Sequence, residues 1–333
     1  MRSRLLPAAA VVAAFALCAP DAGAYLKLGT RIGSSVISLK WSTLPIRYFI
    51  TNQDVPGVTA PQLQQAVSTA FATWDAAPDV NLGAEFAGFT GTSPLQNPSE
   101  TVLGFADRPD LDRVLGSTSF TVDTVSGEIV EADIFFNSIF PWSTAPAGES
   151  GRYDVQSIAL HEIGHLLGLG HSALGETELR AGGRRVLASE AVMFPIAFSP
   201  GSIDQRTLHA DDIAGISDVY PNDTIRRRTG SISGRVTKNG SGVAGAHVIA
   251  YAPSTGKLVA GFTLTDDGAF VIASLDPGPY VVRVEPLDDA DSDSFFDASV
   301  HVDANFRPAF YPQLVVVPAG GTSRSVELKV VAK

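Results

Sequence analysis

Cysteine is nearly absent from this chain of 333 residues, which carries only Cys18. One thiol cannot form an internal disulfide bond, so the sequence excludes a disulfide-stabilised scaffold. Basic residues are also few, because 24 Lys and Arg stand against 35 Asp and Glu, for a net charge of −11. Such an acidic chain is a poor candidate for binding nucleic acid or an anionic membrane. Apolar residues make up 45%, which excludes an intrinsically disordered chain, and the length favours two domains.

Long apolar runs are scarce too, and the clearest one stands at the start of the chain. Arg2 and Arg4 give a basic beginning, and an apolar core follows over 5–17. Residues 22–24 read Ala-Gly-Ala, a small-residue cleavage site. The run is too short to span a bilayer comfortably. We therefore predict a signal peptide over 1–24 and a secreted, extracellular protein without membrane insertion, with periplasmic residence left open.

The rest of the chain divides by composition into a mixed α/β part and a β-rich part. A strand is predicted at 44–50, and helix signals occur in three segments, 59–74, 154–167 and 211–220. Thr59 and Asp154 are the expected N-caps of the first two helices. After a polar, basic linker at 222–229, short alternating runs separated by turns predict a small all-β sandwich over 230–333.

Histidine is also rare: there are six, and three of them lie in the motif HEIGHLLGLGH at 161–171. On a helix, side chains four residues apart share one face, about 5–6 Å apart, so His161 and His165 can hold one metal ion. Gly168 then ends the helix, because glycine tolerates the backbone of a sharp turn, and His171 can return as a third ligand. Three imidazoles suit zinc and leave a fourth tetrahedral position for water, which is the pattern of a catalytic site.

Glu162 is the candidate general base beside this site. It points about 100° around the helix from His161, so it can reach a water on the metal rather than the metal. Zinc lowers the pKa of its water to about 7 and stabilises the oxyanion that forms. A carboxylate here can take the water's proton and pass it to the leaving amine. A core helix with incidental histidines is the alternative, and it leaves the extended motif unexplained.

The extended motif resembles that of the metzincin zinc endopeptidases, in which a methionine turn follows the third histidine. The segment AVMFP offers Met193 for this turn. Ser172 after the third histidine resembles the matrixin branch, the matrix metalloproteinase-like peptidases of the M10A type and their bacterial relatives. LKWSTLPIRYFI resembles the start of a matrixin catalytic domain, and HADDIAGISDVYP resembles its final helix. The resemblance covers about 38–221.

This resemblance implies a fold and an activity. It implies an α+β catalytic domain over 25–221, with a twisted five-stranded mixed sheet, three helices and a cleft that holds one catalytic zinc ion. The implied activity is zinc-dependent endopeptidase cleavage of protein or peptide substrates. Met193 would lie beneath the zinc ligands as an apolar floor, and we expect a monomer.

The chain also departs from the family pattern. A long insertion at 172–191 separates His171 from Met193 and borders the cleft, so substrate preference cannot be carried over. No histidine precedes His161, so the family's structural zinc site has no imidazoles here. The stretch ADIFFNSIFPW stands where calcium ligands are expected, so Ca²⁺ is conceivable but lacks a specific motif. No propeptide with a cysteine switch is visible.

Residues 113–120, RVLGSTSF, are the candidate edge strand for substrate binding, with Leu115, Gly116, Ser117 and Thr118 at its centre. An exposed edge offers unpaired N–H and C=O groups, so an extended peptide can add as a further strand. A surface strand without a ligand role is the alternative, because the sequence does not fix the register.

The C-terminal part resembles carboxypeptidase regulatory-like domains, which are transthyretin-like β-sandwiches. The matching residues are Gly234, Val236, Gly245, Ala246, Val248, Thr265, Gly268, Phe270, Leu275, Pro277, Gly278 and Tyr280. They imply a fold but no chemistry, so the ligand of this domain is unknown. An acidic loop at 288–297 could bind calcium, although a solvated loop is favoured. The basic run 226–228 is either a processing site or a plain linker.

The sequence is also compatible with functions of other classes. A catalytically silent metzincin-fold binding protein is disfavoured by the presence of Glu162. A surface-adhesion protein that uses the β-sandwich as its active part is a second rival. Another metzincin branch is disfavoured by Ser172 and by Phe194-Pro195 after the methionine.

Overall fold

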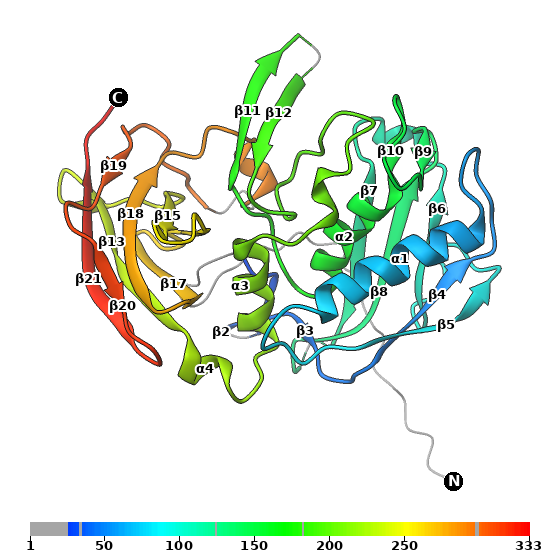
Figure 1. The fold of residues 1–333 in the computed structure, drawn as a ribbon, viewed down its shortest axis with the longest axis horizontal. Coiled ribbons are helices and arrows are strands. Elements are labelled where there is room, and N and C mark those ends of the chain that lie inside the picture. Colours follow the sequence, from blue (N-terminus) through cyan, green and yellow to red (C-terminus); the bar gives the residue numbers. More distant parts are fainter. Residues whose placement is uncertain (1–25, 33–34, 124, 182, 297–299) are drawn as a thin grey trace.

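The computed structural model describes residues 26–32, 35–123, 125–181, 183–296 and 300–333. The predicted signal peptide and Cys18 lie outside the described residues. No helix in the described part of the chain is long and apolar enough to cross a membrane. The chain forms two lobes, a sheet-and-helix lobe and a β-sandwich (Figure 1).

A twisted mixed sheet forms the centre of the first lobe. Its strand order is β5-β4-β6-β8-β7, and β3 extends it beside the start of β8. The strands are β3 (Lys40–Trp41), β4 (Ile46–Thr51), β5 (Ala84–Thr90), β6 (Thr101–Ala106), β7 (Gly116–Val122) and β8 (Glu128–Asn137). Strands β4, β5, β6 and β8 run parallel, whereas β7 pairs with β8 antiparallel. The predicted five-stranded mixed sheet is confirmed, with the two-residue β3 as an addition.

Two helices pack together on this sheet (Figure 1). Helix α1 (Ala60–Asp75) begins with a capping box between Thr59 and Gln62, and α2 (Val155–Leu166) begins at Asp154, whose carboxylate accepts a hydrogen bond from the Ser157 backbone. These caps satisfy N–H groups that a helix start otherwise leaves unpaired. The helices share the apolar core of the sheet, and Trp74 of α1 donates its indole N–H to the Leu160 carbonyl of α2 at 2.9 Å.

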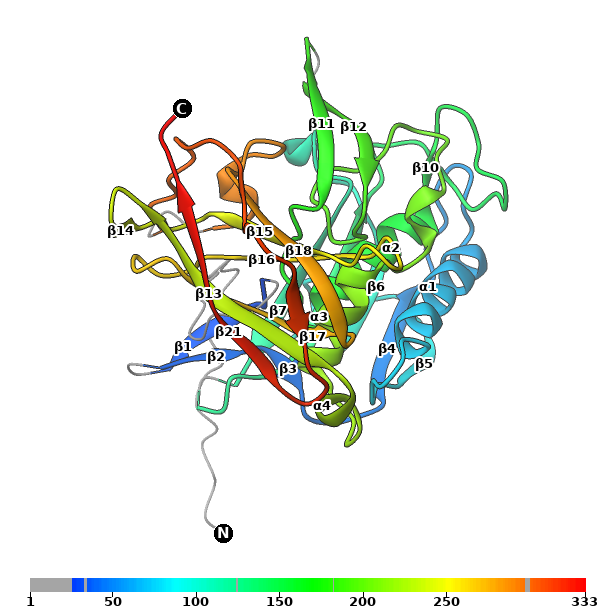
Figure 2. The same cartoon turned by 60° about the vertical axis from the view of Figure 1, so that its left-hand side comes forward.

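Shorter elements complete the first lobe. They are β1 (Gly29–Ile32), β2 (Ser35–Ser38), η1 (Pro109–Leu111), β9 (Trp142–Ser143), β10 (Tyr153–Asp154), β11 (Gly175–Arg180), β12 (Gly183–Ser189), η2 (Asp204–Arg206) and α3 (Ala210–Val219). The insertion at 172–191 forms the β11–β12 hairpin, which projects from the molecule between the two lobes (Figures 1 and 2).

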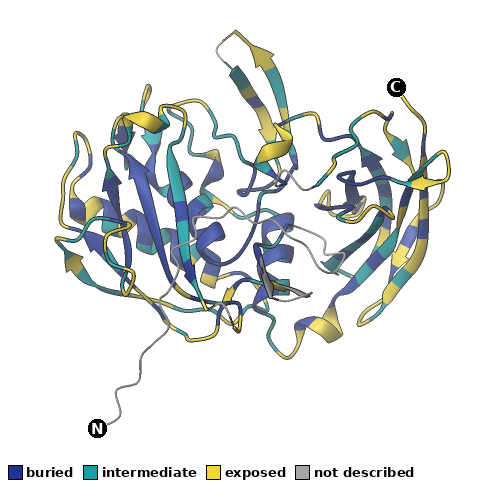
Figure 3. Cartoon of the chain, turned by 180° about the vertical axis from the view of Figure 1, so that it is seen from behind, coloured by how far each residue is buried: buried dark blue, intermediate teal, exposed yellow. Residues whose placement is uncertain are grey.

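The second lobe is a sandwich of two sheets. The first has the order β14-β13-β17 with β21 on β13, and the second has β16-β15-β18-β19 with β20 on β18. The strands are β13 (Gly230–Lys238), β14 (Ser241–Gly242), β15 (His247–Tyr251), β16 (Leu258–Phe262), β17 (Ala269–Leu275), β18 (Gly278–Glu285), β19 (Ala309–Phe310), β20 (Val315–Val317) and β21 (Thr322–Val330), with η3 (Ser292–Ser294) in a loop. The outermost strand, β21, alternates buried and exposed side chains along its second half (Figure 3).

The two lobes share apolar contacts. Leu174 and Ala191, which flank the hairpin, pack with Ile249 of β15 and Ala260 of β16. Ala214 of α3 belongs to the core cluster of the sandwich. The sandwich therefore rests directly on the first lobe.

The segment predicted as a linker, 222–229, is itself ordered by contacts. It contains the short helix α4 (Ile225–Arg228), whose Ile225 is buried. Arg228 pairs with Asp79 of the first lobe and, at 3.0 Å, with Asp276 of the sandwich. The sequence of 222–229 predicted a linker because the partners that order this segment are distant along the chain.

Candidate metal centre

Helix α2 and the turn after it bring the three motif histidines together. His161 and His165 lie one turn apart on α2, and the chain reverses at Gly168, whose φ of +96° is strained for any side chain. A Cβ atom at this position would lie 2.2 Å from the Leu39 carbonyl oxygen. The reversal returns His171 to the other two, and one nitrogen from each ring lies within 4.8 Å of the others. The predicted triad therefore exists as a cluster.

Backbone carbonyl groups hold all three imidazole rings. The Nδ1 atom of His161 lies 2.8 Å from the Val192 oxygen, and that of His165 lies 2.8 Å from the Leu169 oxygen. The Nδ1 atom of His171 lies 2.5 Å from the oxygen of Ser294, a residue of the sandwich. A carbonyl oxygen only accepts, so each Nδ1 carries the hydrogen and each Nε2 keeps a free lone pair.

The donor set fits a zinc ion. Nε2 of His165 and Nε2 of His171 lie 3.1 Å apart, and two facing lone pairs at this distance repel unless a cation lies between them. Zinc–nitrogen bonds of about 2.0–2.1 Å in a tetrahedral site place their nitrogens about 3.3 Å apart, close to this separation. Among the described residues, this triad forms a group of at least three His, Cys, Asp or Glu side chains that lie close enough together to hold a metal ion.

The surroundings keep the three imidazoles neutral, which is the form that binds metals. Burial lowers the pKa of His161 and, more strongly, that of His165. Burial, with the nearby His161, lowers the pKa of His171 to about 3. A buried imidazolium would be poorly solvated and would repel its neighbours.

Glu162 lies buried between α2 and β7. Its carboxylate accepts a hydrogen bond of 2.8 Å from the Thr118 hydroxyl, which also lies 2.9 Å from the Glu162 carbonyl oxygen. Burial raises the pKa of Glu162 to about 7, although the Thr118 hydrogen bond opposes this rise. A Cβ atom at Gly116 would lie 3.1 Å from the same carboxylate, so a glycine lets β7 approach closely.

The predicted substrate strand, 113–120, overlaps β7 at 116–122, which is the antiparallel edge strand of the sheet, so Leu115 lies just before it. Strand β7 pairs with β8, and no described strand pairs with its other side. Of the four residues named from the sequence, Gly116 and Thr118 contact Glu162. Leu115 packs on the core, and Ser117 is paired with Phe135 of β8.

Met193 lies directly against the histidine helix. Its side chain is buried, and a Cβ atom on Gly164, between the two histidines of α2, would lie 2.2 Å from the methionine sulfur. The Met193 carbonyl accepts a hydrogen bond of 2.9 Å from the Ser172 backbone. The turn is thereby joined to the residue that follows His171.

Two buried aspartates of α3 support this turn, and sequence reasoning missed them. The Asp212 carboxylate accepts hydrogen bonds from the backbone N–H groups of Val192, at 2.9 Å, and Met193, at 3.2 Å. Asp211 accepts from the Ser172 hydroxyl at 2.6 Å, and burial raises its pKa to about 7. Two acidic residues at the start of the predicted helix 211–220 suit a helix N-terminus, so the sequence does not show that they are buried supports. Their position in an otherwise apolar helix is the available signal.

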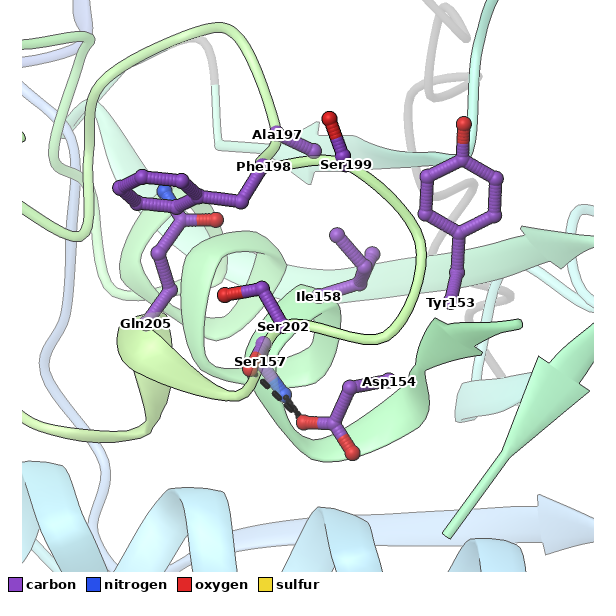
Figure 4. Close-up of a pocket in the computed structure, with 9 residues that line it drawn as sticks. All are labelled: Tyr153, Asp154, Ser157, Ile158, Ala197, Phe198, Ser199, Ser202 and Gln205. Atoms are coloured by element: carbon purple, nitrogen blue, oxygen red, sulfur yellow. Dashed lines mark hydrogen bonds between the residues drawn. The ribbon is translucent and has the colours of Figure 1, made fainter. Parts of the chain in front are cut away.

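A small pocket opens between α2 and the segment that follows Met193 (Figure 4). Ile158, which lies one turn before His161, forms its floor with Ala197 and Phe198 on the opposite side. Its lining is Tyr153, Asp154, Ser157, Ile158, Ala197, Phe198, Ser199, Ser202 and Gln205. The Asp154 carboxylate is paired with Arg206 and caps α2, so it is structurally engaged.

An α+β domain whose buried helix carries two histidines of a metal-binding triad, with a carboxylate between them, defines the class of zinc metallopeptidase domains. Comparison with known families agrees that this is a zinc metallopeptidase domain and identifies its family. The family model described as Matrixin matches residues 40–221, more than half of the chain, and the model described as Carboxypeptidase regulatory-like domain matches residues 231–325. The chain therefore belongs to the matrixin family, and its histidine triad is typical of the catalytic zinc site of matrixins.

Similar proteins occur in plants. The chain is 44% identical to Metalloendoproteinase 5-MMP of Arabidopsis thaliana over 68 residues, which are 20% of this chain and 14% of that protein. It is 28% identical to Metalloendoproteinase 2-MMP of Arabidopsis thaliana over 169 residues, 48% of this chain and 37% of that protein. It is 43% identical to Metalloendoproteinase 1 of Glycine max over 75 residues, 21% of this chain and 18% of that protein. The chain thus spans well under half the length of these relatives.

Proposed function

We propose that this protein is a secreted zinc-dependent endopeptidase that cleaves peptide bonds in proteins. The observation that carries the proposal is the orientation of the triad: three carbonyl groups hold the rings so that three unprotonated Nε2 atoms converge. His161, His165 and His171 would hold the ion. A zinc ion bound there supplies a Lewis acid that polarises the substrate carbonyl and acidifies water.

Glu162 is proposed as the general base and proton carrier. It lies on the histidine helix beside His161, and its carboxylate is held by Thr118. It would accept a proton from the attacking water and deliver it to the amine that leaves when the peptide bond breaks. Thr118 keeps the carboxylate in one orientation throughout this transfer.

Strand β7 is proposed to bind the substrate backbone. Its free edge offers N–H and C=O groups at residues beside Glu162, so an extended peptide added there would pass the metal centre.

The division of the chain and its location outside the cytoplasm are also proposed. We propose that 1–24 is a removable signal peptide, that 25–221 is the catalytic unit, and that 230–333 is the sandwich domain with 222–229 between them. The protein would act outside the cytoplasm as a monomer. Its bacterial type is proposed from the resemblance to the bacterial matrixins, and no specific motif supports a Ca²⁺ site.

The test is cleavage of an unstructured protein such as casein by the mature chain and by Glu162→Ala. Zinc content is measured in both preparations. We expect the wild type to cleave casein, a chelator to stop it, and the variant to be inert while it keeps its zinc. A wild type that holds no zinc contradicts the proposal. If both proteins hold zinc and neither cleaves any of several denatured proteins, the domain is a binding module instead.

A further inference from the structure

We infer that the C-terminal sandwich supplies part of the metal centre, because its loop 287–296 fixes the orientation of His171. This loop is called the docking loop here. The inference rests on the proposed zinc function and adds to it a role for the second domain. In this inference the docking loop orients a ligand of the metal.

The hydrogen bond from His171 to Ser294 carries the inference. The Nδ1–H groups of His161 and His165 are held by carbonyl groups of the first lobe, Val192 and Leu169. The third group, on His171, donates to a carbonyl of the sandwich at 2.5 Å, across 123 residues of sequence. Such a partner on the second ring nitrogen selects the tautomer and the ring orientation that a metal needs.

Aromatic packing holds the docking loop against the metal centre. Phe295, next to Ser294, is fully buried, and its ring lies 6.2 Å from the His171 ring in an edge-on arrangement. On its other side, Phe295 lies 5.5 Å from Phe262 of β16. The same cluster includes Ala173 of the first lobe. The loop is therefore anchored in both lobes at the point where it meets His171.

The β11–β12 hairpin also forms hydrogen bonds with the docking loop. The Thr177 backbone N–H donates to the Asp289 carboxylate at 2.8 Å, and the Thr177 hydroxyl donates to the Asp289 carbonyl at 2.7 Å. Arg184 donates to the Asp288 carbonyl at 2.9 Å and lies 3.7 Å from the Asp291 carboxylate. The insertion that sets this chain apart from the family pattern thus serves to hold the loop.

A third connection reaches the residue that follows His171. One carboxylate oxygen of Asp211 accepts a hydrogen bond from the Ser172 hydroxyl. The other accepts a hydrogen bond of 2.8 Å from the backbone N–H of Ala260. Ala260 lies on β16, an edge strand of the sandwich. The sandwich therefore contacts His171 directly through Ser294, and it is connected to the neighbouring Ser172 through Asp211.

These contacts predict that zinc affinity depends on the docking loop. Removal of a partner of this kind typically weakens metal binding about 10- to 100-fold. The carbonyl of Ser294 cannot be removed by substitution, so the loop must be released through its anchors. Phe295→Ala removes the aromatic anchor, and Thr177→Val removes a hydrogen bond from the hairpin at nearly constant side-chain shape.

The experiment uses the full mature chain. Zinc dissociation constants are measured by competition with a chromophoric chelator, and the absorption spectrum of the Co²⁺-substituted protein reports on ligand geometry. We expect the dissociation constant to rise about 10-fold or more in Phe295→Ala, and less in Thr177→Val, with altered cobalt bands in both. Matched controls are Phe306→Ala, at a fully buried phenylalanine of the sandwich core, and Thr322→Val, at an exposed position of β21; both should keep wild-type affinity.

Several outcomes overturn the inference. If the wild type binds zinc tightly and both variants bind it equally well with an unchanged cobalt spectrum, the loop does not position His171, although the zinc site stands. If Phe295→Ala cleaves casein faster at unchanged affinity, the loop obstructs substrate instead. Equal loss in Phe306→Ala shows a general effect of destabilising the sandwich. A wild type without zinc overturns the proposed function itself.

Discussion

A single hydroxyl on β7 holds the carboxylate of the proposed base. The Thr118 side chain lies within hydrogen-bond distance of both the carboxylate and the backbone carbonyl of Glu162. Because Glu162 is buried, its ionised form has few other groups to stabilise it. Strand β7 and the proposed base are therefore linked, so a shift of β7 would also move the Glu162 carboxylate.

Thr118→Val tests this unit at nearly constant shape. A hydrogen bond to a charged group is worth about 1.5–3 kcal/mol, so we expect kcat/KM to fall about 10-fold or more while zinc content is unchanged. Thr118→Ser keeps the hydroxyl and should retain most activity. Steady-state kinetics on a fluorogenic peptide measures both. Equal activity in the valine variant would show that Glu162 needs no fixed partner.

Gly164 is required by the sulfur of Met193. A Cβ atom there would lie 2.2 Å from this sulfur and 2.9 Å from the Trp74 ring, in a closely packed core. Overpacking of this kind costs about 1–3 kcal/mol, which exceeds the gain in helix propensity, so Gly164→Ala should lower the melting temperature by several degrees. Gly91→Ala is the matched control, because nothing lies within 4 Å of its Cβ position. The melting temperatures are measured by thermal unfolding monitored with circular dichroism. An unchanged melting temperature for Gly164→Ala would contradict the packing argument.

At the scale of elements, local signals predicted the helices and distant contacts determined the rest. Thr59 and Asp154 could be identified as caps because a cap acts within three residues. Two histidines of the triad followed from their spacing along one helix, and the third from the glycine turn after it. The support of His171 by Ser294 could not be predicted, because its partners are 123 residues apart and a backbone carbonyl leaves no trace in sequence. The hairpin in the insertion and the register of β7 depend on pairing between neighbouring strands, which the side-chain pattern alone does not fix.

Strand β8 carries a pair of buried carboxylates, Glu131 and Asp133, whose titration affects stability. Burial raises the pKa of Glu131 to about 8 and also raises that of Asp133; the Thr121 hydroxyl donates to Glu131 at 2.6 Å. Between the ordinary pKa of 4.5 and about 8, the folded state holds a proton that the unfolded state has lost. The contribution of Glu131 to the free energy of unfolding therefore falls as pH rises through this window, and levels off above it.

Glu131→Gln removes this titration. We expect the stability of the wild type, relative to the variant, to decline between pH 5 and pH 8 by a total on the order of a few kcal/mol. Urea unfolding at intervals of pH measures the difference, in which groups common to both proteins cancel. Parallel pH profiles for the two proteins would show that Glu131 has the same proton affinity in the folded and unfolded states.

For the whole molecule, the interface between the lobes implies joint unfolding. Ile249 of β15 is almost fully buried, yet it packs with Leu174 and Ala191 of the first lobe in a cluster separate from the core of the sandwich. Arg228 joins Asp79 and Asp276 across the same boundary. Loss of either lobe would expose this apolar surface, so each lobe stabilises the other.

Calorimetry of the intact chain should therefore show one cooperative transition. Ile249→Asp places an unpaired charge in the interface while it spares the sandwich core, and it should split the transition into two. Val316→Asp, at the exposed middle position of β20, is the control and should leave a single transition. The same interface keeps the docking loop against His171. If the unfolding transition of Ile249→Asp splits, this variant should therefore also bind zinc more weakly. Two independent transitions in the wild type would mean that the lobes fold separately, and the metal centre would then have to be complete within the first lobe alone.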